Sequence, residues 1–138
     1  MQVAGLSHRG AYNGIGEKFA QLQDLAPAPE KRMGTVALYY DDPHSTPEED
    51  LRSLAGIIVS DGEKIAGLEN AEIPAGKYAM ATFIGDYIEL PKAWEEFYGA
   101  IFAQGLKTKA DLCFEQYRNM PGEVPDDQLK TELYAPLA

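Results

Sequence analysis

A glutamate in the middle of an apolar strand is the first feature that suggests chemistry. The stretch is Leu112-Cys113-Phe114-Glu115-Gln116-Tyr117. Strand alternation places Cys113, Glu115 and Tyr117 on one face of it and the other three residues on the opposite face. A carboxylate buried there is costly unless it finds a cation, hydrogen-bond donors, a proton or water. A concave site for a cationic ligand would provide a partner. The alternative is that Glu115 reaches an exposed face or makes a structural hydrogen bond.

The net charge narrows the classes of partner. The 138 residues contain 12 Lys and Arg against 22 Asp and Glu, a formal charge of -10. Such a chain repels nucleic acids and anionic membranes, and it has no basic patch to overcome that repulsion. The acidity would attract lipophilic cations, or it serves solubility alone. The length is typical of one domain, here residues 1–138.

The cellular compartment and possible cofactors follow from a few residue types. The single cysteine, Cys113, excludes an internal disulfide and suits a reducing cytoplasm. No apolar run is long enough to span a membrane, and no signal peptide begins the chain. We therefore expect a cytoplasmic protein. His8 and His44 lack metal-ligand spacing to each other or to Cys113. The acidic loop around Asp41 matches no calcium loop, so neither a metal nor a cofactor is expected.

Periodicity and turn residues predict an order of strands and helices. Strands are expected over residues 3–8, 35–40, 54–59, 71–74, 77–84, 112–117 and 131–135. Helices are expected over residues 15–25 and 90–102, the first ended by Pro27 and Pro29 and the second by Gly105. The second helix has an apolar stripe that is typical of core packing, made of Leu90, Trp94, Phe97 and Ile101.

The two halves of the chain, residues 1–60 and 77–138, repeat one another around a connector at 61–76. His8-Arg9-Gly10-Ala11-Tyr12 corresponds to Phe83-Ile84-Gly85-Asp86-Tyr87, and Val36-Ala37-Leu38-Tyr39 corresponds to Phe114-Glu115-Gln116-Tyr117. Thr46-Pro47-Glu48-Glu49-Asp50-Leu51-Arg52 likewise corresponds to Val124-Pro125-Asp126-Asp127-Gln128-Leu129-Lys130. The repeat predicts an α+β fold. Two strand-helix-strand-strand units would form an antiparallel sheet with both helices on one face, related by a pseudo-two-fold axis.

The repeat is broken at the glutamate, because Ala37 stands where the second half has Glu115. If Phe114 and Val36 face the helices, then Ala37, Tyr39, Glu115 and Tyr117 share the opposite face. A small residue paired with a glutamate and flanked by tyrosines predicts a pocket for a flat or cationic organic ligand. Tyr12 and Tyr87 each precede a helix, and at least one of them is expected at the mouth of this cleft.

Motifs spread over nearly the whole chain resemble those of the GyrI-like small-molecule-binding family. They are Val3-Ala4-Gly5-Leu6 with His8-Arg9-Gly10 and Tyr12; Tyr39-Tyr40-Asp41-Asp42-Pro43; Thr46-Pro47-Glu48 with Leu51-Arg52; Ile73-Pro74-Ala75-Gly76-Lys77-Tyr78-Ala79; Ala93-Trp94; Cys113-Phe114-Glu115 with Tyr117; and Tyr134. The family includes the DNA gyrase inhibitory protein and the effector-binding domains of AraC-type and MerR-type regulators.

The resemblance implies a duplicated, SHS2-like fold with a ligand cleft on the pseudo-two-fold axis. It also implies that Glu115 binds cationic ligands, since this residue matches the glutamate of the family's Phe-Glu-x-Tyr stretch. The candidate ligand-binding residues are Glu115, Tyr117, Tyr39, Ala37, Cys113, Tyr12, Tyr87 and Trp94. Two departures stand out. The chain contains no helix-turn-helix, so it is not expected to be a complete regulator of the usual kind. It also begins inside the family's usual first strand.

Three functions are compatible with these residues. The leading hypothesis is a stand-alone binding module for aromatic or cationic compounds, with a separate DNA-binding protein as a further possible partner. The second is a hydrolase that opens reactive cyclopropane rings, with Glu115 as the catalytic base and a tyrosine as proton donor. Some stand-alone relatives resemble hydrolases of this kind. The third is inhibition of DNA gyrase through protein–protein contact. Turnover of a reactive compound distinguishes the second from the first, and a supercoiling assay tests the third.

Overall fold

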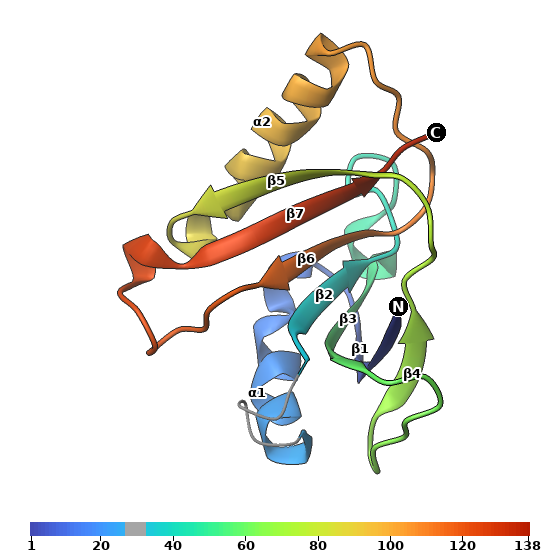
Figure 1. Cartoon of the computed structure of the whole chain (residues 1–138), viewed down its shortest axis with the longest axis vertical. Helices are drawn as coiled ribbons and strands as arrows, with labels where there is room; N and C mark the ends of the chain where they lie inside the picture. The colour runs from blue at the N-terminus through green and yellow to red at the C-terminus, as the bar shows by residue number, and fades with distance from the viewer. Residues whose placement is uncertain (27–32) are drawn as a thin grey trace. The chain divides into compact units, whose positions relative to one another are not determined.

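The computed structural model describes residues 1–26 and 33–138, which fall into two units, Met1–Ala75 and Gly76–Ala138. Each unit contains strands that pair antiparallel and one α-helix (Figure 1). Because the candidate carboxylate and the groups around it belong to the second unit, the arrangement of that unit determines the chemistry discussed below.

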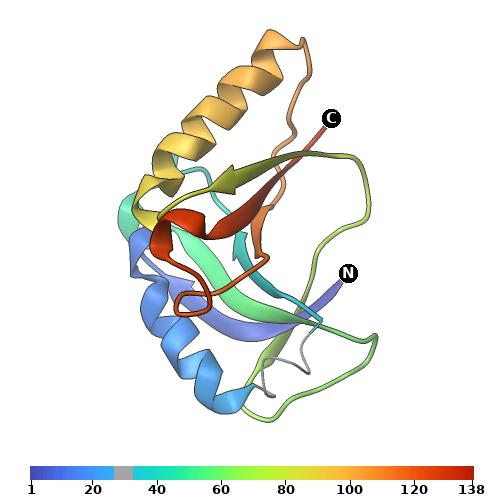
Figure 2. The ribbon, with the colours of Figure 1, turned by 60° about the vertical axis from the view of Figure 1, so that its left-hand side comes forward.

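The first unit is a four-stranded sheet with one helix packed on it. Its strands are β1 (Gln2–Arg9), β2 (Thr35–Tyr39), β3 (Arg52–Val59) and β4 (Glu69–Glu72), in the order β4-β1-β3-β2. Helix α1 (Gly16–Leu25) lies along β1 and β3, as Figure 2 shows. The fully buried Leu22 of α1 packs against Ala4, Ile57 and Val59 of those strands. Burial of such aliphatic side chains holds the helix on its sheet.

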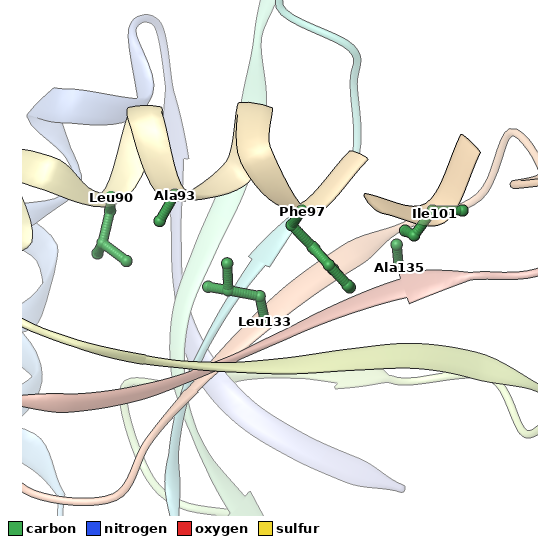
Figure 3. Packing of buried hydrophobic residues seen from close by; sticks show 6 residues of the cluster. All are labelled: Leu90, Ala93, Phe97, Ile101, Leu133 and Ala135. Atoms are coloured by element: carbon green, nitrogen blue, oxygen red, sulfur yellow. The ribbon is translucent and has the colours of Figure 1, made fainter. Parts of the chain in front are cut away.

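The second unit is a three-stranded sheet covered by a longer helix. Its strands are β5 (Tyr78–Ile84), β6 (Cys113–Tyr117) and β7 (Lys130–Pro136), in the order β6-β7-β5. Helix α2 (Leu90–Ala103) has buried side chains at helical spacing, namely Leu90, Ala93, Phe97 and Ile101. Figure 3 shows them directed at Leu133 and Ala135 of β7. Gly105 follows the helix with φ +74, a left-handed conformation that favours glycine and ends the helix as expected.

Matching backbone hydrogen bonds make the internal repeat visible in the structure. The amide of Gly10 donates to the carbonyl oxygen of Leu51 at 2.8 Å, and the amide of Gly85 donates to that of Leu129 at 2.9 Å. The short helices η3 (Glu48–Asp50) and η5 (Asp126–Gln128) each follow a proline. Two others, η1 (Tyr12–Gly14) and η4 (Tyr87–Glu89), each lead into an α-helix.

The repeat extends to a side-chain contact. Asp41 Oδ2 accepts a hydrogen bond from the Arg52 amide at 2.8 Å. Asn119 Oδ1 accepts one from the Lys130 amide at the same distance. These equivalent contacts hold the loop before the last strand of each repeat.

The predicted α+β fold of two antiparallel strand-helix-strand-strand units is confirmed. One strand is displaced from its expected position: β4 covers Glu69–Glu72 rather than residues 71–74, because Gln2–Gly5 of β1 pair with these residues. Pro27 and Pro29, which were expected to end the first helix, lie outside the described residues. None of the described helices is long and apolar enough to cross a membrane.

Candidate functional site

The Glu115 carboxylate lies inside the second unit and accepts two short hydrogen bonds. The indole N–H of Trp94 donates to Glu115 Oε2 at 2.7 Å, and the hydroxyl of Tyr117 donates to Oε1 at 2.7 Å. Glu115 is only 2% exposed. Hydrogen bonds from neutral donors make such burial tolerable without cancelling the charge of the carboxylate. Among the alternatives left open by the sequence, the exposed glutamate is therefore wrong.

The face on which Glu115 lies differs from the prediction. Its cross-strand partner on β7 is Leu133, and directly opposed residues of neighbouring strands point to the same side of a sheet. Leu133 packs under α2, and Trp94, which is itself part of α2, bonds the carboxylate. Glu115 and Tyr117 therefore face the helix of their unit, and the expected pocket on the face away from the helices is wrong.

The first unit requires the same correction. Thr35 of β2 is paired with Ile57, which packs in the cluster under α1. Ala37 and Tyr39 follow Thr35 at alternate positions and so face α1 as well. The prediction failed because β2 and β6 are buried on both faces. Phe114, which was taken for a core residue under the helix, instead stacks on Tyr134 with ring centroids 4.4 Å apart.

Tyr87 places a second aromatic ring beside Tyr117. Their ring centroids are 5.5 Å apart. The Tyr87 hydroxyl oxygen is buried and has no hydrogen-bond partner among the residues that the structure describes. Burial, together with the negative charge of Glu115 and of two more distant acids, raises the pKa of Tyr87 to about 12. The group is therefore a neutral hydroxyl at physiological pH, and a buried hydroxyl of this kind normally has a partner.

Tyr98 belongs to the same cluster, although it was not among the ligand-binding residues predicted from the sequence. Its ring lies 5.7 Å from that of Trp94, and its hydroxyl is 3.0 Å from Sγ of Cys113. The signal that could have identified it is its spacing, since it follows Trp94 by four positions and therefore shares one side of α2. We call Trp94, Tyr98, Cys113, Glu115, Tyr117 and Tyr87 the Glu115 cluster.

The equivalent place in the first unit has the tyrosines without the carboxylate. Tyr12 and Tyr39 have ring centroids 4.7 Å apart. The Tyr12 hydroxyl donates to the Asp41 carbonyl oxygen at 2.6 Å and accepts from the Asp41 amide at 3.0 Å. Ala37, the counterpart of Glu115, is fully buried. Tyr12 is thus fixed by backbone groups, whereas its counterpart Tyr87 keeps an unsatisfied hydroxyl.

The polar and aromatic groups of the Glu115 cluster limit what it can do chemically. It offers a carboxylate acceptor, phenol and indole donors, and ring faces that attract cations. Within the described part of the chain, no three His, Cys, Asp or Glu side chains are grouped as they would be to hold a metal. Binding of an organic molecule and proton transfer between Glu115 and Tyr117 are the two activities that these groups support.

Comparison with known proteins identifies relatives of this chain. The chain is 33% identical over 87 residues to DNA gyrase inhibitor 2 of Dickeya dadantii, a match covering 60% of this chain and 55% of that protein. The chain thus spans just over half the length of that relative. It is 28% identical to the probable transcriptional regulator YgiV of Escherichia coli, covering 99% of this chain and 89% of that one.

A solved structure and a family model complete the comparison. The structure of SAV2435 bound to tetraphenylphosphonium matches with a TM-score of 0.69 at 15% identity, covering 100% of this chain and 88% of that one. At this identity the likeness shows the fold alone. The model of the GyrI-like small molecule binding domain matches residues 1–138. The chain therefore belongs to the GyrI-like small-molecule-binding domain family.

Proposed function

We propose that the Glu115 cluster binds small organic cations that carry aromatic groups. One observation supports this more than any other: a carboxylate that is 2% exposed is held by neutral indole and phenol donors within an aromatic wall. Neutral donors orient the carboxylate without neutralising its negative charge. The proposal makes this domain a module for sensing or sequestering drug-like or toxic compounds.

The physical basis is a charge in a poorly solvated, aromatic setting. Coulombic attraction is stronger where water is excluded, so a cation near Glu115 would gain more than at the protein surface. The rings of Trp94, Tyr98 and Tyr87 would add cation–π and dispersion contacts. The net charge of -10 would raise the rate at which cations arrive.

Tyr87 is proposed to contact the ligand directly. Its hydroxyl is buried and has no partner within the described ranges, so a ligand acceptor or a bound water would satisfy it. The sequence prediction that Cys113 and, in the first repeat, Tyr12, Tyr39 and Ala37 also contribute stays a prediction. Conservative variants such as Tyr39→Phe and Ala37→Val test those contributions by their effect on ligand affinity.

A direct test uses the fluorescence of Trp94, the only tryptophan of the chain. Its indole nitrogen lies 2.7 Å from Glu115, so a cation bound at the carboxylate should change its emission. Titration with tetraphenylphosphonium should give a saturable change and a parallel rise in melting temperature through mass action. A linear, unsaturable response with an unchanged melting temperature would mean that no such site exists.

A second candidate is hydrolysis of a strained, electrophilic ring. The observation that favours it is the 2.7 Å hydrogen bond between the Tyr117 hydroxyl and Glu115. This pair could supply both a base that takes a proton from water and an acid that protonates the opened product. Incubation with a cyclopropane-containing alkylating compound, followed by mass spectrometry, should then show a product heavier by one water. Under this hypothesis Glu115→Gln abolishes turnover and largely retains binding.

Gyrase inhibition is the third candidate, and the Dickeya relative of that name is its support. The acidic character of the chain is compatible with binding to a basic protein surface. Adding the purified chain to a gyrase supercoiling reaction tests it. Inhibition that persists in Glu115→Gln would place that activity on a surface other than the Glu115 cluster.

A further inference from the structure

Thr131 on β7 carries a buried hydroxyl that the fold leaves unsatisfied. The residue is 0% exposed, and its Oγ1 has no hydrogen-bond partner among the residues that the structure describes. A buried hydroxyl without a partner costs stability, and most such groups in proteins bond to another protein group, a water or a ligand. The Thr131 hydroxyl therefore marks a position where a polar atom from outside the chain would be stabilised.

The strand register places Thr131 beside the Glu115 cluster. Thr131 is paired with Tyr117 on β6 and with Phe83 on β5, and directly opposed residues point to the same side of a sheet. Leu133, the next residue on that side of β7, is paired with Glu115. Thr131 is therefore the diagonal neighbour of Glu115, and such neighbours are about 7–8 Å apart in an antiparallel sheet. One drug-sized molecule can contact both side chains.

A second unsatisfied hydroxyl belongs to the aromatic ring that packs on Tyr117. The ring centroids of Tyr87 and Tyr117 are 5.5 Å apart, and the Tyr87 hydroxyl oxygen is buried without a partner in the described structure. Tyr87 and Phe83, the latter paired with Thr131, both pack against the apolar cluster under α2. Two hydroxyl donors thus lie next to Tyr117 on the α2 side of the sheet. A carbonyl oxygen has two lone pairs and can accept from both donors.

The internal repeat shows which part of this arrangement is particular to the second unit. Ser53 is the counterpart of Thr131, since it is paired with Tyr39, and its buried hydroxyl likewise has no partner in the described part of the chain. Tyr12, the counterpart of Tyr87, is instead satisfied by backbone groups. Among the described residues, two unsatisfied hydroxyls therefore flank one tyrosine only in the unit that carries the buried carboxylate.

We propose that Thr131 and Tyr87 form a carbonyl-binding subsite for a cation bound at Glu115. The inference rests on the proposed function: the carboxylate pairs with the charge of the ligand, and the two hydroxyls donate to a carbonyl oxygen of the same molecule. An aromatic cation without an acceptor leaves both hydroxyls unsatisfied and binds less tightly. Glu115 is itself 2% exposed, so a ligand reaches it only by displacing the packing over β6 and β7, the strands whose same face carries Thr131.

Two phosphonium ions of equal charge and similar shape test the subsite. The para-acetylphenyl(triphenyl)phosphonium ion carries a carbonyl, and the para-isopropylphenyl(triphenyl)phosphonium ion replaces it by an apolar group of similar size. Isothermal titration calorimetry should show about tenfold tighter binding of the acetyl compound, since it gains two hydrogen bonds from buried donors. Tetraphenylphosphonium, which has no acceptor, is the reference for binding at the carboxylate alone.

Single substitutions assign the preference for the acetyl compound to the two hydroxyls. Thr131→Val retains the shape of the side chain and removes its hydroxyl, whereas Thr131→Ser retains the hydroxyl. We expect the preference to fall about threefold to fivefold in Thr131→Val and in Tyr87→Phe, and to remain in Thr131→Ser. Ser53→Ala is the matched control, because it removes the equivalent unsatisfied hydroxyl from the unit without the carboxylate, and it should leave the preference unchanged. Thermal melts verify that each variant folds.

Two results would overturn the subsite and leave cation binding at Glu115 intact. One is equal affinity of the acetyl and isopropyl compounds while tetraphenylphosphonium still binds, which would mean that buried water satisfies the hydroxyls. The other is a preference that persists in both Thr131→Val and Tyr87→Phe, or that falls equally in Ser53→Ala. Failure of all three phosphonium ions to bind would refute the proposed function itself, and the subsite with it.

Discussion

Replacing Glu115 by glutamine removes the charge of the cluster with little change in shape. The amide oxygen of the glutamine can accept from the Trp94 indole as Oε2 does at 2.7 Å. The NH₂ group would then face Tyr117. In the unchanged protein the Tyr117 hydroxyl donates to Oε1 at 2.7 Å, and in the variant it can rotate to accept instead. Because both contacts keep a donor and an acceptor, we expect the free energy of unfolding to change little.

The effect on ligand affinity should be larger and should depend on the charge of the ligand. Loss of a contact to a charged group costs about 1–3 kcal/mol, or roughly 5-fold to 150-fold in Kd. For tetraphenylphosphonium we expect a loss within this range. For triphenylphosphine oxide, a neutral compound with similar rings, we expect less than about threefold, because ring contacts with Trp94 and Tyr87 remain.

Isothermal titration calorimetry of both compounds against both proteins measures these differences. Glu96→Gln is the matched control, since it makes the same substitution at an exposed position of α2. It lowers the net negative charge equally, so any general effect of charge appears in it too. Denaturant unfolding of each variant verifies that folding is preserved.

Two results would refute the reasoning. If Glu115→Gln and Glu96→Gln weaken tetraphenylphosphonium equally, the effect comes from overall charge and not from the buried carboxylate. If the neutral compound loses as much affinity as the cation, Glu115 affects the shape of the site and does not pair with the charge of the ligand.

Three further predictions concern the groups around this site and its counterpart in the first repeat. Trp94→Phe removes the donor to Glu115 Oε2 and should lower the free energy of unfolding by about 2 kcal/mol; urea unfolding followed by circular dichroism measures it, and an unchanged midpoint would contradict it. Tyr87→Phe removes a buried hydroxyl that has no partner in the described structure, so it should raise stability by up to about 1 kcal/mol at neutral pH while weakening ligand binding. The pKa of Tyr87 is raised from 10.0 to about 12 on folding, so the contribution of this pKa shift to the free energy of unfolding is fully present below pH 10 and is lost as the pH rises toward 12. The phenylalanine variant should therefore show a smaller fall in melting temperature at alkaline pH. Hydrogen bonds from Arg52 hold the pKa of Asp41 below 3.8. The contribution of the Asp41 carboxylate to the free energy of unfolding is therefore present above this pH and is lost as the pH falls further. Asp41→Asn should flatten this acid dependence of stability, and an unchanged pH profile would be the contrary result.

The repeat and the unusual glutamate could be predicted from residue order alone. Glycine before each α-helical segment, proline before η3 and η5 and alternation within strands are local signals, since they depend on backbone conformation and on neighbours in sequence. The matched bonds of Gly10 and Gly85 confirm the correspondence that these residues predicted. Glu115 stood out because a carboxylate in an apolar strand requires partners whatever the fold.

The partners of Glu115 and the face on which it lies depended on tertiary structure. Alternation indicates two faces of a strand but identifies the core face only when one face is exposed, and β6 is buried on both. Trp94 lies 21 positions before Glu115, so only the packing of α2 on β7 through Leu133 brings the indole to the carboxylate. The same packing buries the Tyr87 hydroxyl without a hydrogen-bond partner among the described residues, whereas the Tyr12 hydroxyl donates to the carbonyl oxygen of Asp41. Such long-range pairings are absent from local sequence patterns because they arise from how a helix is oriented on its sheet.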